Sequence, residues 1–373
     1  MDNPQPHFRY YPEGRHSTGE LRYIGGLPVL SVGGSPEQIG AAVGALALRP
    51  APRMAAYPED MLRLFRCGWL ALALRRLGEG MVERFDPDYR AEFEAVVRAS
   101  DVERGRMVMG NTLFDLKKLV ACSGFGLEGP RSVTGSPVLG RNLDYPDGGY
   151  AHHYTMVTVC RPAGKLAFAS VGFPGLVGVL SGMNEAGLAV AVLEVFQAPL
   201  RVRRLDPWGT PYALCLREVL ETCSTIDEAY GLLSRKRRTT LYNVALADRQ
   251  RVAAFEVTPA RVFERRSRDG VCVCTNHFHG ATLQPAFALN WMDTFGRDRK
   301  LNWVARQKGR FDVADVHRAM HLASAWDTLQ TMAFEPESLQ LHLAFGAIPA
   351  SAGPLATLGL APLLRGEALR GAA

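Results

Sequence analysis

The sequence predicts an α+β protein in which two antiparallel β-sheets form a sandwich covered by helices. The chain has 373 residues, of which 47% are hydrophobic and 21% charged, so it can bury a large core. Apolar residues recur at helical spacing before residue 122, and short strand-like runs dominate after it. Strands, helices, strands, helices and a final hairpin then follow in an order typical of a layered sandwich.

The first third of the chain reads as mainly helical. Ser35, Pro36 and Glu37 form a helix-start signature before an apolar periodic run. We expect helices over 35–48, 54–65, 88–100 and 103–121. We therefore divide the chain into a mainly helical segment, 1–121, and a strand-rich catalytic segment, 122–373, which together form one integrated structural unit.

The second segment begins with a run of closely spaced strands. They are expected over 137–144, 154–160, 165–171, 176–183 and 187–195, separated by turn signals such as Gly-Phe-Pro-Gly. Connections this short allow only antiparallel pairing, so a meander is predicted.

The remaining elements complete the sandwich. Helices are expected over 210–223 and 225–234, strands over 240–248, 251–259, 260–267 and 271–278, further helices over 292–307 and 313–325, and a closing hairpin over 328–346.

Charge and composition argue against several classes of partner. The net charge of +6 and the basic runs 201–205 and 234–238 lack any helix-turn-helix, RNP or zinc-finger pattern, so we interpret them as solvated surface and expect no nucleic-acid partner. The longest apolar helical run, 61–78, is too short and too rich in arginine to span a membrane. The first 15 residues contain no apolar signal run, and seven cysteines are an odd number. We expect a cytoplasmic protein, and assembly as a homo-oligomer stays open.

Cys122 is the most informative residue, because Arg141 and Asp144 follow it closely. A nearby fixed cation is the usual means of forming a reactive thiolate at neutral pH. If the bond between Ala121 and Cys122 were cut, the new α-amino group would be a base within the nucleophile's own residue. A buried cysteine that packs as a small hydrophobe beside an ordinary ion pair is the alternative reading.

The motifs around Cys122 resemble a known family. C-S-G-F followed by G-R-N-L-D-Y-P resembles the C-T-S-x…G-R-N-x-D signature of cysteine-type N-terminal-nucleophile (Ntn) hydrolases. The chain is most similar to the acyl-coenzyme A:6-aminopenicillanate acyltransferase-like group, with acid ceramidase, N-acylethanolamine acid amidase and choloylglycine hydrolase as distant relatives. The resemblance implies the four-layer αββα Ntn-hydrolase fold.

The same resemblance implies a set of catalytic residues. Arg141 and Asp144 match the family's arginine and aspartate, and Asn276 matches an asparagine that binds the oxyanion. Arg297 matches a later arginine at the border of the site, with Arg299 as a rival for that role.

Three further residues are expected to bind substrate. Glu194 stands where choloylglycine hydrolases place an oxyanion-binding asparagine, so its carboxyl group is either protonated, turned away, or bound to a substrate amine or hydroxyl. Phe173 and His277 lie in apolar and aromatic segments expected to line the pocket.

The resemblance implies an amidohydrolase or acyltransferase that acts on a small-molecule amide, thioester or ester through an acyl-Cys122 intermediate, after self-cleavage between Ala121 and Cys122. No metal or organic cofactor is expected, since Cys272 and Cys274 form a C-x-C without a second pair.

Two rival interpretations remain open. One is a papain-like thiol hydrolase in which His277, His279 or His152 is the base. The other is an inactive binding protein on the same fold.

Overall fold

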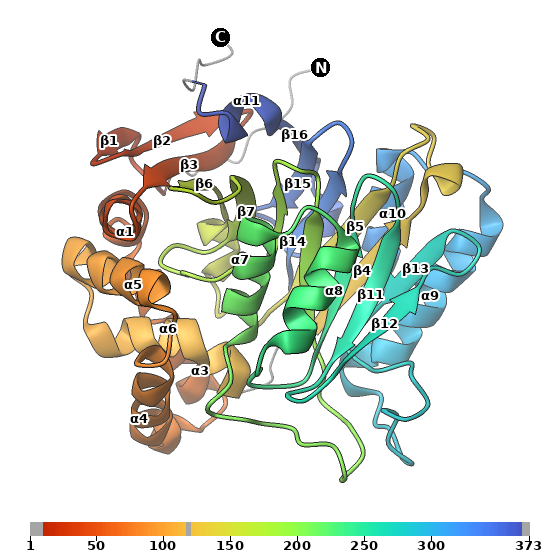
Figure 1. Cartoon of the computed structure of the whole chain (residues 1–373), viewed down its shortest axis with the longest axis horizontal. Helices are drawn as coiled ribbons and strands as arrows, with labels where there is room; N and C mark the ends of the chain where they lie inside the picture. The colour runs from red at the N-terminus through yellow and green to blue at the C-terminus, as the bar shows by residue number, and fades with distance from the viewer. Residues whose placement is uncertain (1–9, 117–120, 368–373) are drawn as a thin grey trace.

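The computed structural model describes residues 10–116 and 121–367, which form two facing β-sheets with helices on both outer sides (Figure 1). One sheet has ten strands, in the spatial order β1 (Gly14–His16), β2 (Gly19–Ile24), β3 (Leu27–Gly34), β6 (Met156–Pro162), β7 (Phe168–Gly172), β8 (Ser181–Asn184), β9 (Ala189–Glu194), β10 (Tyr242–Ala247), β11 (Val252–Val257) and β12 (Val262–Arg266). The other has six, in the order β13 (Val271–Cys274), β4 (Ala121–Leu127), β5 (Val138–Asp144), β14 (Thr328–Glu335), β15 (Gln340–Phe345) and β16 (Ala356–Gly359).

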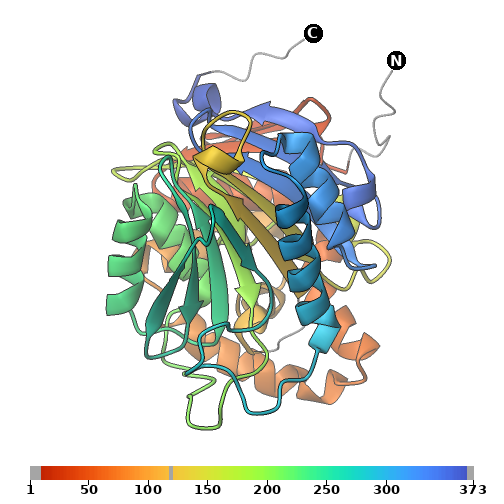
Figure 2. The ribbon, with the colours of Figure 1, turned by 90° about the vertical axis from the view of Figure 1, so that its right-hand side faces the viewer.

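Helices complete the outer layers. They are α1 (Pro36–Val43), α2 (Pro52–Ala55), α3 (Tyr57–Leu64), α4 (Ala71–Val82), α5 (Pro87–Ser100), α6 (Arg104–Leu116), α7 (Tyr212–Thr222), α8 (Ile226–Arg235), α9 (Thr294–Gln307), α10 (Val313–Leu322) and α11 (Ala361–Leu364). Helices α7 and α8 cover the ten-stranded sheet, while α9 and α10 cover the six-stranded sheet, as Figure 2 shows from the side. The predicted four-layer αββα sandwich is therefore confirmed.

The first segment contains three strands that the sequence analysis did not expect. Strands β1 to β3 occupy 14–34, before α1. Gly25 and Gly26 join β2 to β3 with φ of 56° and 81°, the left-handed geometry of a tight hairpin turn. This Gly-Gly pair is a hairpin signal that the analysis overlooked.

The expected meander is correct only in part. Strands β6 to β9 pair antiparallel in sequence, but β5 leaves them and pairs with β4 and β14 in the other sheet. The ten-stranded sheet also contains one parallel pair, β3 with β6, so it is not wholly antiparallel. Parallel pairing needs a long crossover connection, and here the chain between the end of β3 and the start of β6 forms it.

Several boundaries differ from the prediction. The helix expected over 103–121 is described as far as Leu116, and residues 117–120 lie outside the described part. Ala121 already belongs to β4, which was not predicted as a strand. Strand β16 and helix α11 follow the hairpin that was expected to close the chain.

One residue of the basic run 234–238 departs from the expected solvated surface, while Ser234, Arg235 and Arg237 are exposed. Arg238, in the run 234–238, is fully buried, and its guanidinium donates to the carbonyl oxygens of Leu233, Lys236, Thr258 and Pro259. This arginine therefore connects the end of helix α8 to the loop that follows β11 and does not face a partner. Among the described residues, no helix is both long and apolar enough to cross a bilayer.

Candidate functional site

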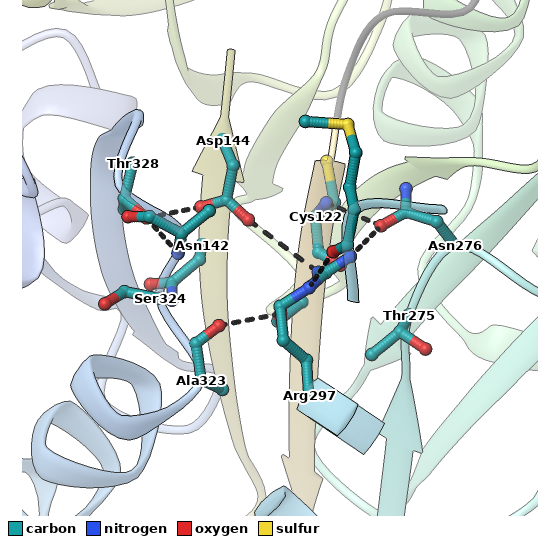
Figure 3. A network of polar contacts seen from close by, with 12 residues as sticks. Cys122, Asn142, Asp144, Thr275, Asn276, Arg297, Ala323, Ser324 and Thr328 are labelled. Atoms are coloured by element: carbon teal, nitrogen blue, oxygen red, sulfur yellow. Dashed lines mark hydrogen bonds and ion pairs between the residues drawn. The ribbon is translucent and has the colours of Figure 1, made fainter. Parts of the chain in front are cut away.

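Strand pairing brings the predicted residues around Cys122 together. Cys122 is the second residue of β4 and is 1% exposed. In the β4–β5 register, Ala121 lies opposite Asp144, and Gly124 opposite Arg141. Because side chains alternate along a strand, Arg141 points between the sheets, where its Nε donates to Ser181 of β8. Asp144 lies on the other face, towards Arg297 of α9 (Figure 3).

A polar network holds the backbone of Cys122 (Figure 3). The Cys122 N–H donates to Asn276 Oδ1 at 2.7 Å. Arg297 Nη2 donates to the same oxygen at 2.8 Å, and Arg297 Nη1 donates to the Cys122 carbonyl and, at 2.9 Å, to Ser123 Oγ. The peptide groups on either side of Cys122 are thus fixed by an amide and a guanidinium.

Asp144 closes this network on the β5 side. Its Oδ2 lies 3.7 Å from Arg297 Nη1, and its Oδ1 accepts a hydrogen bond from Thr328 Oγ1 at 2.5 Å. Burial raises the pKa of the Asp144 carboxyl group, against the lowering effect of Arg297. Thr328 lies opposite Asp144 in the β5–β14 register, next to a β-bulge in β14.

The side chain of Cys122 lines a very small cavity of about 10 Å³ between the sheets. Its walls are Arg141, Leu143, Tyr145, Phe173, Leu180, Val192, Glu194 and Tyr212. Burial, together with the charges of Asp144 and Glu194, raises the pKa of the thiol to about 11, while Arg141 lowers it. Arg141 therefore favours the thiolate, as expected, but burial outweighs its charge in this form of the chain.

Arg141 retains hydrogen-bonding capacity beside the thiol. Its Nε donates to Ser181 Oγ at 3.1 Å and its Nη1 to the Asn142 carbonyl at 2.9 Å. Its Nη2 has no hydrogen-bond partner among the described residues, although it is buried. A buried donor of this kind can bind a charge that develops in the cavity.

Glu194 is not turned away from the site. Its carboxyl group lines the cavity and accepts a hydrogen bond from the Tyr212 hydroxyl at 2.9 Å. Its backbone carbonyl accepts a bond from Asn276 Nδ2 at 2.8 Å. The Asn276 amide thus accepts hydrogen bonds at Oδ1 and donates one from Nδ2.

The structure places the other candidates differently. Phe173 lines the Cys122 cavity, as predicted. His277 does not: its Nδ1 lies 3.0 Å from Thr275 Oγ1 and 2.9 Å from Thr294 Oγ1, and it lines a neighbouring cavity of about 290 Å³ that also touches Asn276. Burial and His279 lower the pKa of His277 to about 4.

The geometry also decides between the rivals. Arg299 is exposed, whereas Arg297 is 2% exposed and belongs to the network. Among the described residues around the Cys122 cavity there is no histidine. His152 instead pairs with Asp147 at 2.7 Å, and His279 lies beside Asp298.

Sequence reasoning missed four residues at the site: Tyr145, Ser181, Tyr212 and Thr328. Tyr145 directly follows Asp144 in the G-R-N-L-D-Y-P motif, so its position was a usable signal. The other three come from distant elements that only the folded sheets bring near Cys122.

The αββα sandwich, with a cysteine at the start of an inner strand beside arginine, aspartate and asparagine, is that of an Ntn-hydrolase fold. The chain belongs to the acyl-coenzyme A:6-aminopenicillanic acid acyl-transferase family, whose model matches residues 132–336, more than half of the chain. The matched range begins after Cys122 and contains Arg141, Asp144, Asn276 and Arg297.

Three solved structures match parts of the chain. An N-acylethanolamine-hydrolyzing acid amidase ortholog from Caenorhabditis elegans is 16% identical, with a TM-score of 0.45 over 58% of this chain and 93% of that one. A variant of conjugated bile acid hydrolase from Clostridium perfringens is 14% identical, with a TM-score of 0.46 over 64% and 92%. Penicillin V acylase from Agrobacterium tumefaciens is 16% identical, with a TM-score of 0.42 over 61% and 84%. A search of curated proteins found no match.

Proposed function

We propose that the protein is a cysteine-nucleophile amidohydrolase or acyltransferase that works through an acyl-Cys122 intermediate. The observation that carries the proposal is the convergence of Arg141, Asp144, Asn276 and Arg297 on Cys122 in a member of an acyl-transferase family. Arg141 lies beside the thiol, while Asp144, Asn276 and Arg297 form the network around the backbone of the same residue. This arrangement exceeds what packing a small hydrophobe requires.

Activation begins with self-cleavage before Cys122. The Cys122 sulfur attacks the Ala121 carbonyl carbon, the C–N bond breaks, and the proton of the thiol passes to the leaving nitrogen. Water then hydrolyses the resulting thioester, leaving a carboxylate on Ala121 and a free α-amino group on Cys122. The Asn276 and Arg297 contacts support this step, because they hold the two peptide groups of Cys122 in one orientation.

The freed amine changes the chemistry of the thiol. An α-amino group has a pKa of about 7.7 to 8.0, so roughly 10–20% of it is unprotonated at pH 7 and can take the thiol proton. The thiolate attacks the substrate carbonyl, the acyl group stays on sulfur, and the leaving group departs with the proton. Water or an amine then accepts the acyl group and restores the thiol.

The oxyanion of each tetrahedral intermediate needs preorganised donors. The side-chain amide of Asn276, which lies beside the backbone of Cys122, and the Arg141 Nη2 donor are the candidates among the described residues. Removing one such donor typically costs about 2.7–4 kcal/mol of transition-state stabilisation.

The cavity walls indicate the kind of substrate. Phe173, Tyr145 and Tyr212 offer aromatic surface to a small acyl group, while Glu194 offers a carboxyl group to a substrate amine or hydroxyl. Tyr145 and Phe173 also line an adjoining, largely apolar cavity of about 50 Å³, which would extend the space open to an acyl chain.

Intact mass spectrometry of the purified protein tests the proposal. We expect a break before Cys122 on incubation, and an acyl adduct on Cys122 when candidate amides or thioesters are added. Cys122→Ala should give neither the break nor the adduct, while Cys67→Ala, which changes a half-exposed cysteine, should give both. Full turnover by the Cys122→Ala variant would refute the mechanism.

A further inference from the structure

A second cluster of chemically capable side chains lies beside the Cys122 site. His277, His279 and Asp298 each offer one ligand atom, and these three atoms lie within 4.8 Å of one another. The two imidazole rings are stacked, with centroids 4.6 Å apart and an interplanar angle of 20°. His279 Nε2 lies 3.1 Å from Asp298 Oδ2, so the group is already nearly as compact as the donors of a single metal ion.

Two of these atoms are buried and face each other. His279 Nε2 and Asp298 Oδ2 are inaccessible to solvent and pair with each other at 3.1 Å, and neither has a further hydrogen-bond partner among the described residues. The pair therefore uses all of its bonding capacity on this single contact. A cation between the three side chains would give both atoms a common partner.

The opposite atoms of two side chains are held in place. His277 Nδ1 lies within 3.0 Å of the Thr275 and Thr294 hydroxyls, which leaves Nε2 of that ring for another ligand. Asp298 Oδ1 accepts a hydrogen bond from Asn302 Nδ2 at 3.0 Å, which leaves Oδ2 facing His279. Outer contacts that fix the tautomer and orientation of each ligand are a regular feature of protein metal sites.

Access and donor type define the class of ion. All three side chains line the neighbouring cavity of about 290 Å³, so water could complete the coordination. Two imidazoles and one carboxylate suit divalent transition metals such as Zn²⁺, Co²⁺ or Ni²⁺, and not Ca²⁺ or Mg²⁺, which prefer oxygen ligands.

We propose that His277, His279 and Asp298 form a binding site for one divalent transition-metal ion of the zinc class, beside the Cys122 site and separate from it. The site is connected to Asn276 through Thr294, whose hydroxyl accepts a hydrogen bond from the Asn276 N–H at 2.9 Å and also contacts His277. The bound ion would therefore rigidify the segment that carries Asn276.

Titration with Co²⁺ and Zn²⁺ tests the proposal without reference to activity. We use the full chain with Cys122→Ala, so that the active-site thiol cannot bind the metal, and follow Co²⁺ absorption in the visible region and Zn²⁺ binding by calorimetry. One ion per chain is expected. His279→Ala and Asp298→Asn should each weaken binding by about 100-fold, and Asn302→Ala, which removes an outer contact, by about 10-fold.

Matched controls separate this site from general surface binding. His16→Ala removes an exposed imidazole and should leave the affinity unchanged. Circular dichroism of each metal-free variant shows whether the variant is folded. The proposal is overturned if no stoichiometric binding is seen, or if folded His279→Ala and Asp298→Asn variants bind as tightly as the parent, which would leave His279 and Asp298 as an ordinary buried pair.

Discussion

Arg297 is the residue that joins the separate parts of the candidate site. Its guanidinium contacts the Cys122 carbonyl, the Ser123 hydroxyl and the Asn276 amide oxygen, and it lies 3.7 Å from Asp144. These groups come from three different stretches of the chain. A lysine has one point charge and no planar fork, so it cannot satisfy all of them together.

The substitution Arg297→Lys should therefore lower the free energy of unfolding by more than the same substitution at a surface arginine. Breaking a buried ion pair by removing one partner typically costs about 3–5 kcal/mol, and a lysine that keeps the charge should lose part of that, about 1–3 kcal/mol. Urea unfolding measures the change. Arg299→Lys, on the same helix but exposed, is the matched control and should stay within about 0.5 kcal/mol of the parent. Equal effects of the two changes would contradict the assigned role of Arg297.

Asp327 gives the molecule a specific pH dependence. Burial, together with the charge of Asp144, raises the pKa of the Asp327 carboxyl group to about 6, and its Oδ1 has no hydrogen-bond partner among the described residues. Because the folded state holds this proton more tightly than the unfolded state does, its contribution to stability is complete below about pH 4 and is lost as the pH rises through 6.

The substitution Asp327→Asn should remove this loss of stability at higher pH. We expect the variant to be more stable than the parent by about 1–2 kcal/mol at pH 7 to 8, with the difference disappearing towards pH 4. Thermal unfolding across this pH range measures the effect. A constant difference at all pH values would show that packing, and not ionisation, explains the change.

At the level of elements, strand β4 positions the thiol because small residues let the two sheets approach. A Cβ atom added at Gly124 would lie 3.0 Å from Ala245 Cβ of β10, and one at Gly126 would lie 3.1 Å from Val252 Cβ of β11. These glycines have ordinary strand geometry, so their role is close approach and not turn formation. The two sheets therefore approach each other closely at Gly124 and Gly126, next to the cavity at Cys122.

Gly124→Val should force the sheets apart at this point. Overpacking a filled core costs typically about 1–3 kcal/mol, and the change should also slow any cleavage before Cys122 because the register of β4 is disturbed. Gly359→Val provides the control, since Gly359 is an exposed strand glycine with nothing within 4 Å of an added Cβ. Denaturant unfolding of both variants makes the comparison, and an equal loss of stability would contradict the close-approach explanation.

Across the whole molecule, the two segments on either side of Cys122 share one sheet. Strand β3, from the first segment, pairs in parallel with β6, from the second, over Val29 to Gly34. Helix α1 packs on β3, and α5 packs on α1, so these helices of the first segment are attached to the shared sheet. The first segment is therefore part of the core and not a detachable leader.

If the chain is cut before Cys122, the two pieces should remain together. The backbone ladder and the buried apolar contacts between β3 and β6 do not depend on the bond that is broken. Size-exclusion chromatography in native buffer should give one peak containing both fragments, which separate only in denaturant. Elution of two peaks in native buffer would contradict the shared-sheet arrangement.

The sequence was sufficient to predict the layers of the sandwich but not every strand. Periodicity and the Cys122 motifs predicted the sandwich and a site formed by Cys122, Arg141, Asp144, Asn276 and Arg297, which the structure brings together. The raised pKa of the Cys122 thiol could not be predicted from the sequence, because it results from burial, which is a property of the packed sheets.

Local patterns also misjudged single residues. Arg238 lies in a basic run that looks solvated, yet the fold encloses it with four carbonyl oxygens. Its burial depends on the path of the chain around residues 258–259, about 20 positions further on, which no short window centred on the run contains. The same limit explains why His277 was expected at the Cys122 cavity and lies in the next one.

The parallel pairing of β3 with β6 has a consequence for how the gene could be rearranged. Either piece made alone would leave an unpaired strand edge of the large sheet open to water, which favours aggregation. Two separately encoded polypeptides, one ending at Ala121 and one starting at Cys122, would each supply the neighbour that the other lacks. Made in the same cell, they should complement each other into a single particle, with no covalent link ever having joined them.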